Sequence, residues 1–325
     1  MSGYVLGIDG GQSVTVAAVC GLEGQLLGVG RAGPANHVWE AGGVARARKA
    51  VMQSTARAGR AARLGRVRFE AAFLGITGAT EHTRRAVEGC VDTKRFRLAS
   101  DKENALASVT EGKPGVVVIA GTGTITYGEN AKGETADASG WGYLIGDEGG
   151  GFWIARQALA AACRADDGRG EATTLTERLT AAAGVDDLWE VHARIYSGKL
   201  SRAEMAGLAV VAAEAAAAGD RAARRILNAA GRELGLAAGV VARKLEMHRQ
   251  KVMVGMVGGV FDGSPLVRAS FGREVRRHAP RAVLARARYA PVIGSALLAL
   301  KMAGVRITGE VRENLLAASA AVGSK

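Results

Sequence analysis

Residues 4–19, YVLGIDGGQSVTVAAV, contain the pattern that decides the fold: two short apolar runs joined by a glycine-rich turn. Tyr4–Ile8 and Val14–Val19 have the length and composition of strands, and the turn 9–13 lies between them. Glycines in such a turn let backbone amides approach phosphate oxygens, and the hydroxyl of Ser13 adds a donor. The segment therefore predicts a hairpin, and its turn is either a phosphate-binding loop or a tight turn of small residues.

The same arrangement recurs at residues 116–128, VVVIAGTGTITYG. The apolar run Val116–Ala120 is followed by a Gly-Thr-Gly-Thr turn and by a second strand candidate, Ile125–Gly128. Neither turn is a Walker A loop, because the Lys-Ser/Thr pair is missing, and neither is a Rossmann turn leading into a helix. Two such turns, each after a strand, suit the binding of a triphosphate from both sides.

Helical patterns follow each set of strands. Further strands are expected at 25–30, 71–76, 96–99 and 251–257, and helices at 42–64, 80–89, 101–108, most of 152–246, 294–303 and 310–321. The repeated order predicts an α/β protein with two related lobes around a cleft. A chain of 325 residues is long enough for two domains, and we expect one of residues 1–112 with 291–325 and the other of residues 113–290.

Three aspartates lie where they suit chemistry. Asp101 follows the strand 96–99 and starts a helix, so it is either a general base or a helix N-cap. Asp147 lies in GWGYLIGDEG, residues 140–149, where flanking glycines leave it sterically open to a polyol. Asp147 and Glu148 would otherwise serve as first-turn carboxylates of the next helix. Asp9, at a strand end, would approach Mg²⁺ through water.

Composition excludes several classes of protein. The net charge of +12 indicates either a field that attracts anionic ligands or a solvated basic surface, and the absence of zinc-finger spacing argues against a nucleic-acid partner. No apolar stretch reaches the roughly 18 residues of a membrane span, and no signal peptide is evident. The three cysteines have no ligand spacing, so we expect a reducing, cytoplasmic location.

In this order the motifs resemble the N-acetylglucosamine kinase branch of the BadF/BadG/BcrA/BcrD ATPase family, within the sugar kinase, Hsp70 and actin superfamily. The resemblance covers nearly the whole chain, and its most specific part is the block at 140–149. It implies two ribonuclease H-like lobes of the actin-like ATPase fold around a central nucleotide and sugar cleft. It also implies an ATP- and Mg²⁺-dependent kinase that converts an amino sugar, with N-acetylglucosamine favoured, to its 6-phosphate. Glucosamine and glucose are the alternative substrates.

The resemblance assigns roles at matching positions. Asp101 would be the base that activates the sugar 6-hydroxyl, and Asp9 would lie near Mg²⁺. The residues expected to hold the sugar are Asn36, His37, Asp101, Thr124, Gly140, Trp141, Gly142 and Asp147. The residues expected to hold ATP are Gly10, Gly11, Gln12, Ser13, Gly121, Thr122, Gly123, Ala206, Gly258 and Gly259. Dimerisation, which is common among related kinases, stays open.

The first turn departs from the family pattern Asp-Gly-Gly-Gly-Thr-Lys-Thr, because this chain has Gln12 and Ser13 and lacks the lysine. Two rival functions remain. A dehydratase-activating ATPase needs cysteine ligands for an iron–sulfur cluster, and the spacing of the three cysteines does not supply them. A sugar-sensing repressor needs a DNA-binding module, for which a first strand at Tyr4 leaves no room. A catalytically inactive binding protein would be expected to lack Asp101 or Asp147.

Overall fold

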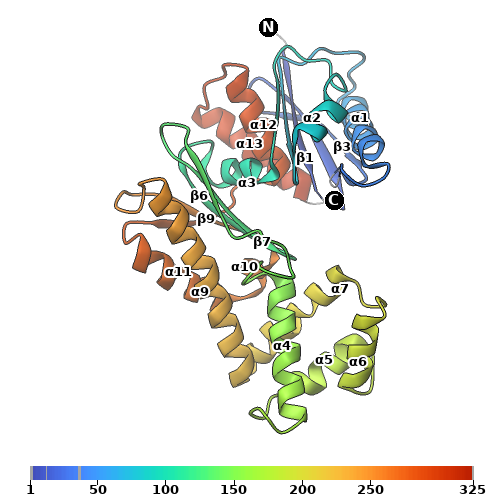
Figure 1. The fold of residues 1–325 in the computed structure, drawn as a ribbon. Helices are drawn as coiled ribbons and strands as arrows, with labels where there is room; N and C mark the ends of the chain where they lie inside the picture. The colour runs from blue at the N-terminus through green and yellow to red at the C-terminus, as the bar shows by residue number, and fades with distance from the viewer. Residues whose placement is uncertain (1–2, 12, 36–37, 324–325) are drawn as a thin grey trace. The chain divides into compact units, whose positions relative to one another are not determined.

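A computed structural model describes residues 3–11, 13–35 and 38–323 (Figure 1). The chain divides into two compact units, which are unit 1 (Met1–Lys113 with Arg286–Lys325) and unit 2 (Pro114–Ala285). In the described ranges each unit is built on a five-stranded sheet covered by helices. The predicted α/β class is therefore confirmed.

The sheet of unit 1 has the strand order β3-β2-β1-β4-β5. Its strands are β1 (Tyr4–Gly10), β2 (Thr15–Gly21), β3 (Leu26–Ala32), β4 (Ala71–Ile76) and β5 (Phe96–Ala99). β1 is antiparallel to β2 but parallel to β4, which is in turn parallel to β5. The carboxyl ends of β1, β4 and β5 consequently meet at one edge of the sheet, where Asp9 lies opposite Gly75 and Asp101 follows β5.

Helices cover both faces of this sheet. They are α1 (Gly43–Ala61), α2 (Glu81–Val87), α3 (Asp101–Thr110), α12 (Pro291–Met302) and α13 (Gly309–Gly323). Because side chains alternate along a strand, Leu6 and Ile8 of β1 pack with α1 and α2, whereas Val5 packs with α12 and α13. Figure 1 shows α1 and α12 on opposite sides of the sheet. A Cβ at Gly7 would lie 2.3 Å from the backbone nitrogen of Ala296, so glycine is required where α12 crosses β1.

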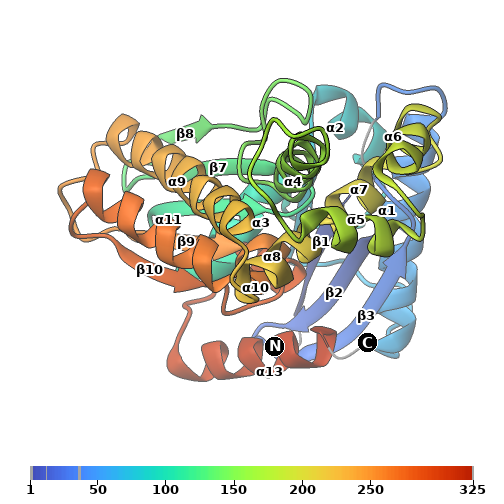
Figure 2. The same cartoon turned by 90° about the horizontal axis from the view of Figure 1, so that it is seen from below.

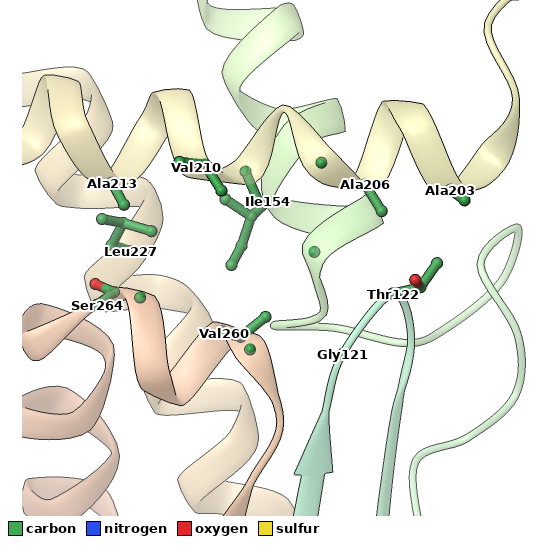
Figure 3. Close-up of a pocket in the computed structure, with 15 residues that line it drawn as sticks. Gly121, Thr122, Ile154, Ala203, Ala206, Val210, Ala213, Leu227, Val260 and Ser264 are labelled. Atoms are coloured by element: carbon green, nitrogen blue, oxygen red, sulfur yellow. The ribbon is translucent and has the colours of Figure 1, made fainter. Parts of the chain in front are cut away.

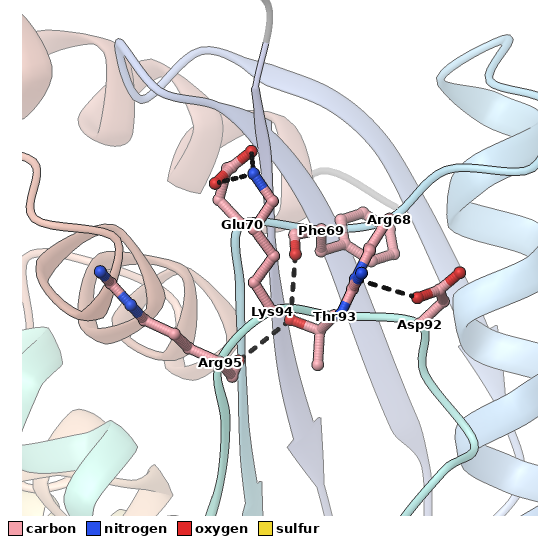
Figure 4. Close-up of polar contacts among 7 residues, drawn as sticks. All are labelled: Arg68, Phe69, Glu70, Asp92, Thr93, Lys94 and Arg95. Atoms are coloured by element: carbon pink, nitrogen blue, oxygen red, sulfur yellow. Dashed lines mark hydrogen bonds and ion pairs between the residues drawn. The ribbon is translucent and has the colours of Figure 1, made fainter.

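Polar contacts join the segments that enter β4 and β5, at the end of these strands remote from Asp101 (Figure 4). Nζ of Lys94 donates to both carboxylate oxygens of Glu70, at 2.7 and 2.9 Å. The Thr93 hydroxyl donates to the carbonyl of Phe69 at 3.2 Å. Exposed ion pairs contribute little stability, but these contacts support the register of the parallel strands, which sets where α3 begins.

Glu111, just after α3, holds the C-terminal segment of the chain onto unit 1. Its side chain is 10% exposed and accepts hydrogen bonds from Nη1 of Arg288 at 2.7 Å and from Nε of Arg312 at 2.8 Å. The hydroxyl of Tyr289 donates to the same carboxylate at 3.3 Å. Burial, together with the negative charge of Glu111, raises the pKa of Tyr289 to about 12.

The sheet of unit 2 has the order β10-β9-β6-β7-β8, so its strands follow the same order as those of unit 1 when read from β8. The strands are β6 (Gly115–Ala120), β7 (Thr124–Glu129), β8 (Thr135–Ala138), β9 (Met253–Val257) and β10 (Val283–Arg286). β6 pairs antiparallel with β7 and parallel with β9, as β1 pairs with β2 and β4. The predicted repetition of one layout is therefore confirmed.

The long helical region of the sequence forms α4 (Gly151–Asp166), α5 (Leu175–Ala183), α6 (Leu188–Tyr196), α7 (Arg202–Gly207), α8 (Ala209–Ala217) and α9 (Arg221–Lys244). Helix α11 (Pro265–His278) overlaps the arginine-bearing segment 268–288, which has helical character in the sequence, whereas the short helix α10 (Gly259–Gly263) and strand β10 were not expected. Figure 2 shows α9 alongside α11, where Gly231 and Gly235 permit close packing. Within the described ranges, no helix combines the length and the apolar character that crossing a lipid bilayer requires.

Candidate active site

Unit 1 brings a half-buried carboxylate and a buried amide together at the carboxyl edge of its sheet. Nδ2 of Asn104, on α3, donates to Oδ1 of Asp9 at 2.9 Å and to the carbonyl of Gly75 at 3.3 Å. A Cβ at Gly75 would lie 2.0 Å from that nitrogen, so glycine is needed for the amide to reach Asp9. Burial raises the pKa of Asp9 to about 6; the hydrogen bond from Asn104 opposes this rise, and the negative charge of Asp101 adds to it.

Asp101 is the first residue of α3, and Ser100 occupies the N-cap position. The alternative interpretation of Asp101 as a helix N-cap is therefore wrong. Two hydroxyls hold its carboxylate, since Thr77 Oγ1 donates to Oδ2 at 2.6 Å and Ser100 Oγ donates to Oδ1 at 3.0 Å. The side chain is half-buried, so it is fixed in place and still within reach of a ligand, as a general base requires.

The first glycine turn closes tightly after β1. Gly10 ends the strand, and the amide of Gly11 donates to the carbonyl of Val14 at 2.9 Å. Ser13 is exposed, so its hydroxyl is accessible to a ligand. Three residues predicted to bind ATP or the sugar lie outside the described ranges: Gln12, Asn36 and His37.

The second glycine turn, Gly121–Gly123, connects β6 to β7 and is bonded to the start of α4. The amide of Gly151 donates to the carbonyl of Gly121 at 2.8 Å, and that of Phe152 donates to the carbonyl of Thr122 at 3.0 Å. Thr124 begins β7, and its Oγ1 is buried without a partner among the described residues. A turn held in this way is a rigid part of unit 2.

A cavity of about 330 Å³ opens beside this turn (Figure 3). Small and aliphatic side chains line it, with α7 and α8 on one side and α10 on the other. Such a lining suits a flat, largely apolar group such as a nucleoside base. Four of the predicted ATP-binding residues lie in the lining: Gly121, Thr122, Ala206 and Gly259. Gly258 has φ 106°, and a Cβ there would lie 2.4 Å from the carbonyl oxygen of Ala120.

Asp147 lies in the loop 139–150, which precedes α4. The flanking glycines predict an open carboxylate, yet the side chain is only 6% exposed, because it packs against the second turn. A Cβ at Gly123 would lie 2.3 Å from Oδ2 of Asp147. The amide of Gly142 donates to Oδ1 at 3.2 Å. No acidic residue lies in the first turn of α4, so the alternative role of Asp147 and Glu148 as first-turn carboxylates is wrong.

The rest of this loop gathers around the second turn. Gly140 and Gly142 have φ of 78° and 89°, a left-handed region that glycine adopts without strain. A Cβ at Gly140 would lie 3.4 Å from the carbonyl oxygen of Thr124. Trp141 is 76% exposed. Unit 2 thus brings together four predicted sugar-binding residues, Thr124, Gly140, Gly142 and Asp147.

The sequence did not point to two residues of these sites, Asn104 and Arg202. Asn104 lies one helical turn after Asp101, so a helical projection from Asp101 is the one available signal. Arg202, at the start of α7, has Nη2 3.6 Å from Oδ2 of Asp147. No motif surrounds Arg202, and its position becomes evident only from the packing of unit 2.

The two sheets have the same strand order, and each begins with a strand, a glycine turn and a second strand. This architecture places the protein in the class of actin-like ATPase and sugar kinase folds. The chain belongs to the BadF/BadG/BcrA/BcrD ATPase family, whose model matches residues 6–299. This finding confirms the resemblance that the motifs indicated.

Two related kinases are similar to this chain over much of its length. The N-acetylmuramic acid/N-acetylglucosamine kinase of Clostridium acetobutylicum is 30% identical over 303 residues, which is 91% of this chain and 98% of that protein. The N-acetyl-D-glucosamine kinase of Dictyostelium discoideum is 31% identical over 208 residues, 63% of this chain and 65% of that protein. Among solved structures, an N-acetylglucosamine kinase candidate from Chromobacterium violaceum has a TM-score of 0.70 and 26% identity, covering 91% of this chain and 98% of its own.

Proposed function

We propose that this protein is an ATP-dependent kinase that phosphorylates an N-acetylated amino sugar, with N-acetylglucosamine, converted to its 6-phosphate, as the favoured substrate. The observation that carries the proposal is the carboxylate of Asp101, which two hydroxyl groups hold at the sheet edge where Asp9 also lies. Membership of an ATPase family and two relatives named as N-acetylglucosamine kinases support this assignment.

Each unit has its own residues with a role in this mechanism. Unit 1 contributes the first turn (Gly10, Gly11, Gln12 and Ser13) and Asp101. Unit 2 contributes the second turn, the adenosine contacts at the cavity of about 330 Å³, and the loop 139–150. Phosphoryl transfer depends mainly on positioning and on neutralising charge, and two amide-rich turns supply donors for both.

Asp101 acts in this mechanism as the general base. Thr77 and Ser100 each donate one hydrogen bond to it, so the carboxylate is oriented before the sugar binds. Such a group accepts the proton of the attacking hydroxyl, and general-base catalysis of this kind contributes about 10²- to 10⁴-fold in rate. Asp147, Thr124 and the backbone of 140–142 hold the sugar, together with Asn36 and His37.

The residues present fit a Mg²⁺ ion. Mg²⁺ keeps several waters and binds through one or two carboxylates plus substrate phosphates, so Asp9 at the strand end would hold it through water. Within the described ranges no three acidic, histidine or cysteine side chains form a metal cage, and Mg²⁺ does not need one. When bound, the ion neutralises phosphate charge. A cytoplasmic location, a homodimer and the absence of nucleic-acid and membrane partners stay predictions.

A substrate panel tests the proposal. ADP release is measured with ATP and, in turn, N-acetylglucosamine, N-acetylmuramic acid, N-acetylmannosamine, glucosamine and glucose. We expect kcat/KM at least tenfold higher for an N-acetylated sugar than for glucosamine or glucose. A preference for glucose or glucosamine would favour the alternative hexose kinase, and the absence of sugar-stimulated turnover with every sugar would contradict the kinase proposal.

A further inference from the structure

Arg202, the first residue of α7, joins three parts of unit 2. Its guanidinium group lies over the ring of Tyr143, 4.7 Å from the ring centroid, and Nη2 lies 3.6 Å from Oδ2 of Asp147. The ring of Tyr143 in turn packs edge-on against Phe152 of α4, with centroids 4.9 Å apart. Arg202 therefore connects α7 to the loop 139–150 and, through that loop, to α4.

The charge of Arg202 compensates a buried carboxylate. Only 6% of the Asp147 side chain is exposed, and the guanidinium of Arg202 places a cation beside it, because Nη2 lies 3.6 Å from Oδ2. The carboxylate also accepts the amide of Gly142 at 3.2 Å and so fixes the path of the loop. A carboxylate can accept about four hydrogen bonds, and therefore Asp147 keeps acceptor capacity for a hydroxyl of a ligand.

The polar network around this loop is incomplete. The distance of 3.6 Å between Arg202 and Asp147 exceeds that of a hydrogen bond, and Nε of Arg202 is buried with no partner in the described part of the chain. The hydroxyls of Thr124, at the start of β7, and of Ser139, in the loop 139–150, are also buried without a partner among the described residues. Buried polar atoms are normally paired, so several unpaired ones in one region point to a polar ligand that completes the network.

The same short helix also forms a wall of the cavity. Ala203 and Ala206 of α7 line it opposite α10 (Figure 3). Arg202 itself is not among the residues that line the cavity, and its side chain lies instead beside Tyr143 and Asp147 of the loop.

We propose that Arg202 is a positioning residue for sugar binding: its guanidinium lies beside Asp147 and over Tyr143 and holds the loop 139–150 in the shape in which Asp147 accepts hydrogen bonds from sugar hydroxyls. This inference rests on the proposed kinase function. Arg202 acts through Asp147 and Tyr143.

Steady-state kinetics of Arg202→Met and Arg202→Lys test the role. We expect Arg202→Met to raise KM for N-acetylglucosamine at least tenfold while KM for ATP changes less than twofold. Arg202→Lys should recover part of the loss, because it keeps the positive charge beside Asp147 but not the planar group over Tyr143. The exposed Arg221→Met serves as the matched control and should behave as wild type. An unchanged KM for the sugar, or a loss that falls mainly on kcat or on KM for ATP, overturns the proposal.

Hydrogen exchange of the ligand-free protein separates this inference from the kinase proposal. Peptides covering 139–150 should exchange at least tenfold faster in Arg202→Met, while β1 and β2 exchange as in wild type. Unchanged exchange at 139–150 overturns the inference even if the kinase stands. If the wild-type protein turns over no sugar, the kinase function and the role of Arg202 in sugar binding are both refuted. The exchange measurement still shows whether Arg202 holds the loop 139–150. Should Arg202→Met fail to fold, Tyr143→Leu removes the ring beneath the guanidinium and should raise KM for the sugar and loop exchange in the same direction.

Discussion

Replacing Asp9 by asparagine should stabilise the protein at pH 8, although Asp9 belongs to the candidate active site. Asparagine keeps the shape of the side chain and an oxygen that can accept the hydrogen bond from Asn104, but it carries no charge that folding would remove from water. Burial raises the pKa of Asp9 from 3.8 to about 6. Each pKa unit corresponds to about 1.4 kcal/mol, so the ionised form of Asp9 costs the folded state about 3 kcal/mol.

Proton binding to Asp9 determines whether stability rises or falls with pH. Between pH 3.8 and about 6 the folded protein holds a proton on Asp9 that the unfolded chain has released, so stability falls as the pH rises through this window. The cost is complete above pH 6 and absent below the unfolded pKa. Asp9→Asn should therefore be as stable as wild type near pH 4 and more stable by up to about 3 kcal/mol at pH 8.

Urea unfolding followed by circular dichroism measures this difference at several pH values, in the absence of divalent cations and nucleotide. Asp186→Asn, at an exposed position of unit 2, serves as the control and should show no pH-dependent gain. A stability difference that does not change with pH would refute the reasoning, as would an Asp9→Asn protein less stable than wild type at pH 8.

Three further substitutions test other parts of the account. Gly123→Ala places a Cβ 2.3 Å from Oδ2 of Asp147, so we expect kcat/KM for the sugar to fall at least 100-fold (~3 kcal/mol); an unchanged value would contradict the packing described. Glu111→Gln weakens the hydrogen bonds from two partly exposed arginines and should lower the free energy of unfolding by about 1.5 kcal/mol in urea titrations, whereas a loss below about 0.5 kcal/mol would show that the network contributes little. Thr77→Val removes the 2.6 Å hydrogen bond to Asp101 and should lower kcat about tenfold, with KM for ATP unchanged; wild-type kcat would exclude an orienting role.

Much of the fold followed from local pattern. The apolar runs at 71–76 and 96–99 coincide with β4 and β5, and the glycine turns after β1 and β6 lie where expected. The segment 268–288 was expected to be helical throughout, but α11 ends at His278 and β10 follows at Val283–Arg286. The close approach of α11 to α9 depends on glycines elsewhere in the chain, which no local pattern shows.

The site was only partly predictable, because some of its contacts join distant residues. The edge that gathers Asp9 and Asp101 follows from parallel pairing of strands that can be read from the sequence. The bond between Asn104 and Asp9 joins residues 95 positions apart, and no local pattern marks it. No local pattern marks the position of Arg202 beside Asp147 either. The burial of Asp147 results from its packing on Gly123, which is also distant in the sequence.

The central claim is that Asp101 accepts the proton of the sugar hydroxyl during phosphoryl transfer from ATP. Its most direct test is single-turnover phosphorylation of N-acetylglucosamine by wild type, Asp101→Asn and the exposed control Asp92→Asn. We expect Asp101→Asn to bind both substrates with wild-type affinity and to transfer phosphate about 10²- to 10⁴-fold more slowly, while Asp92→Asn is unaffected. A transfer rate for Asp101→Asn within tenfold of wild type would contradict it.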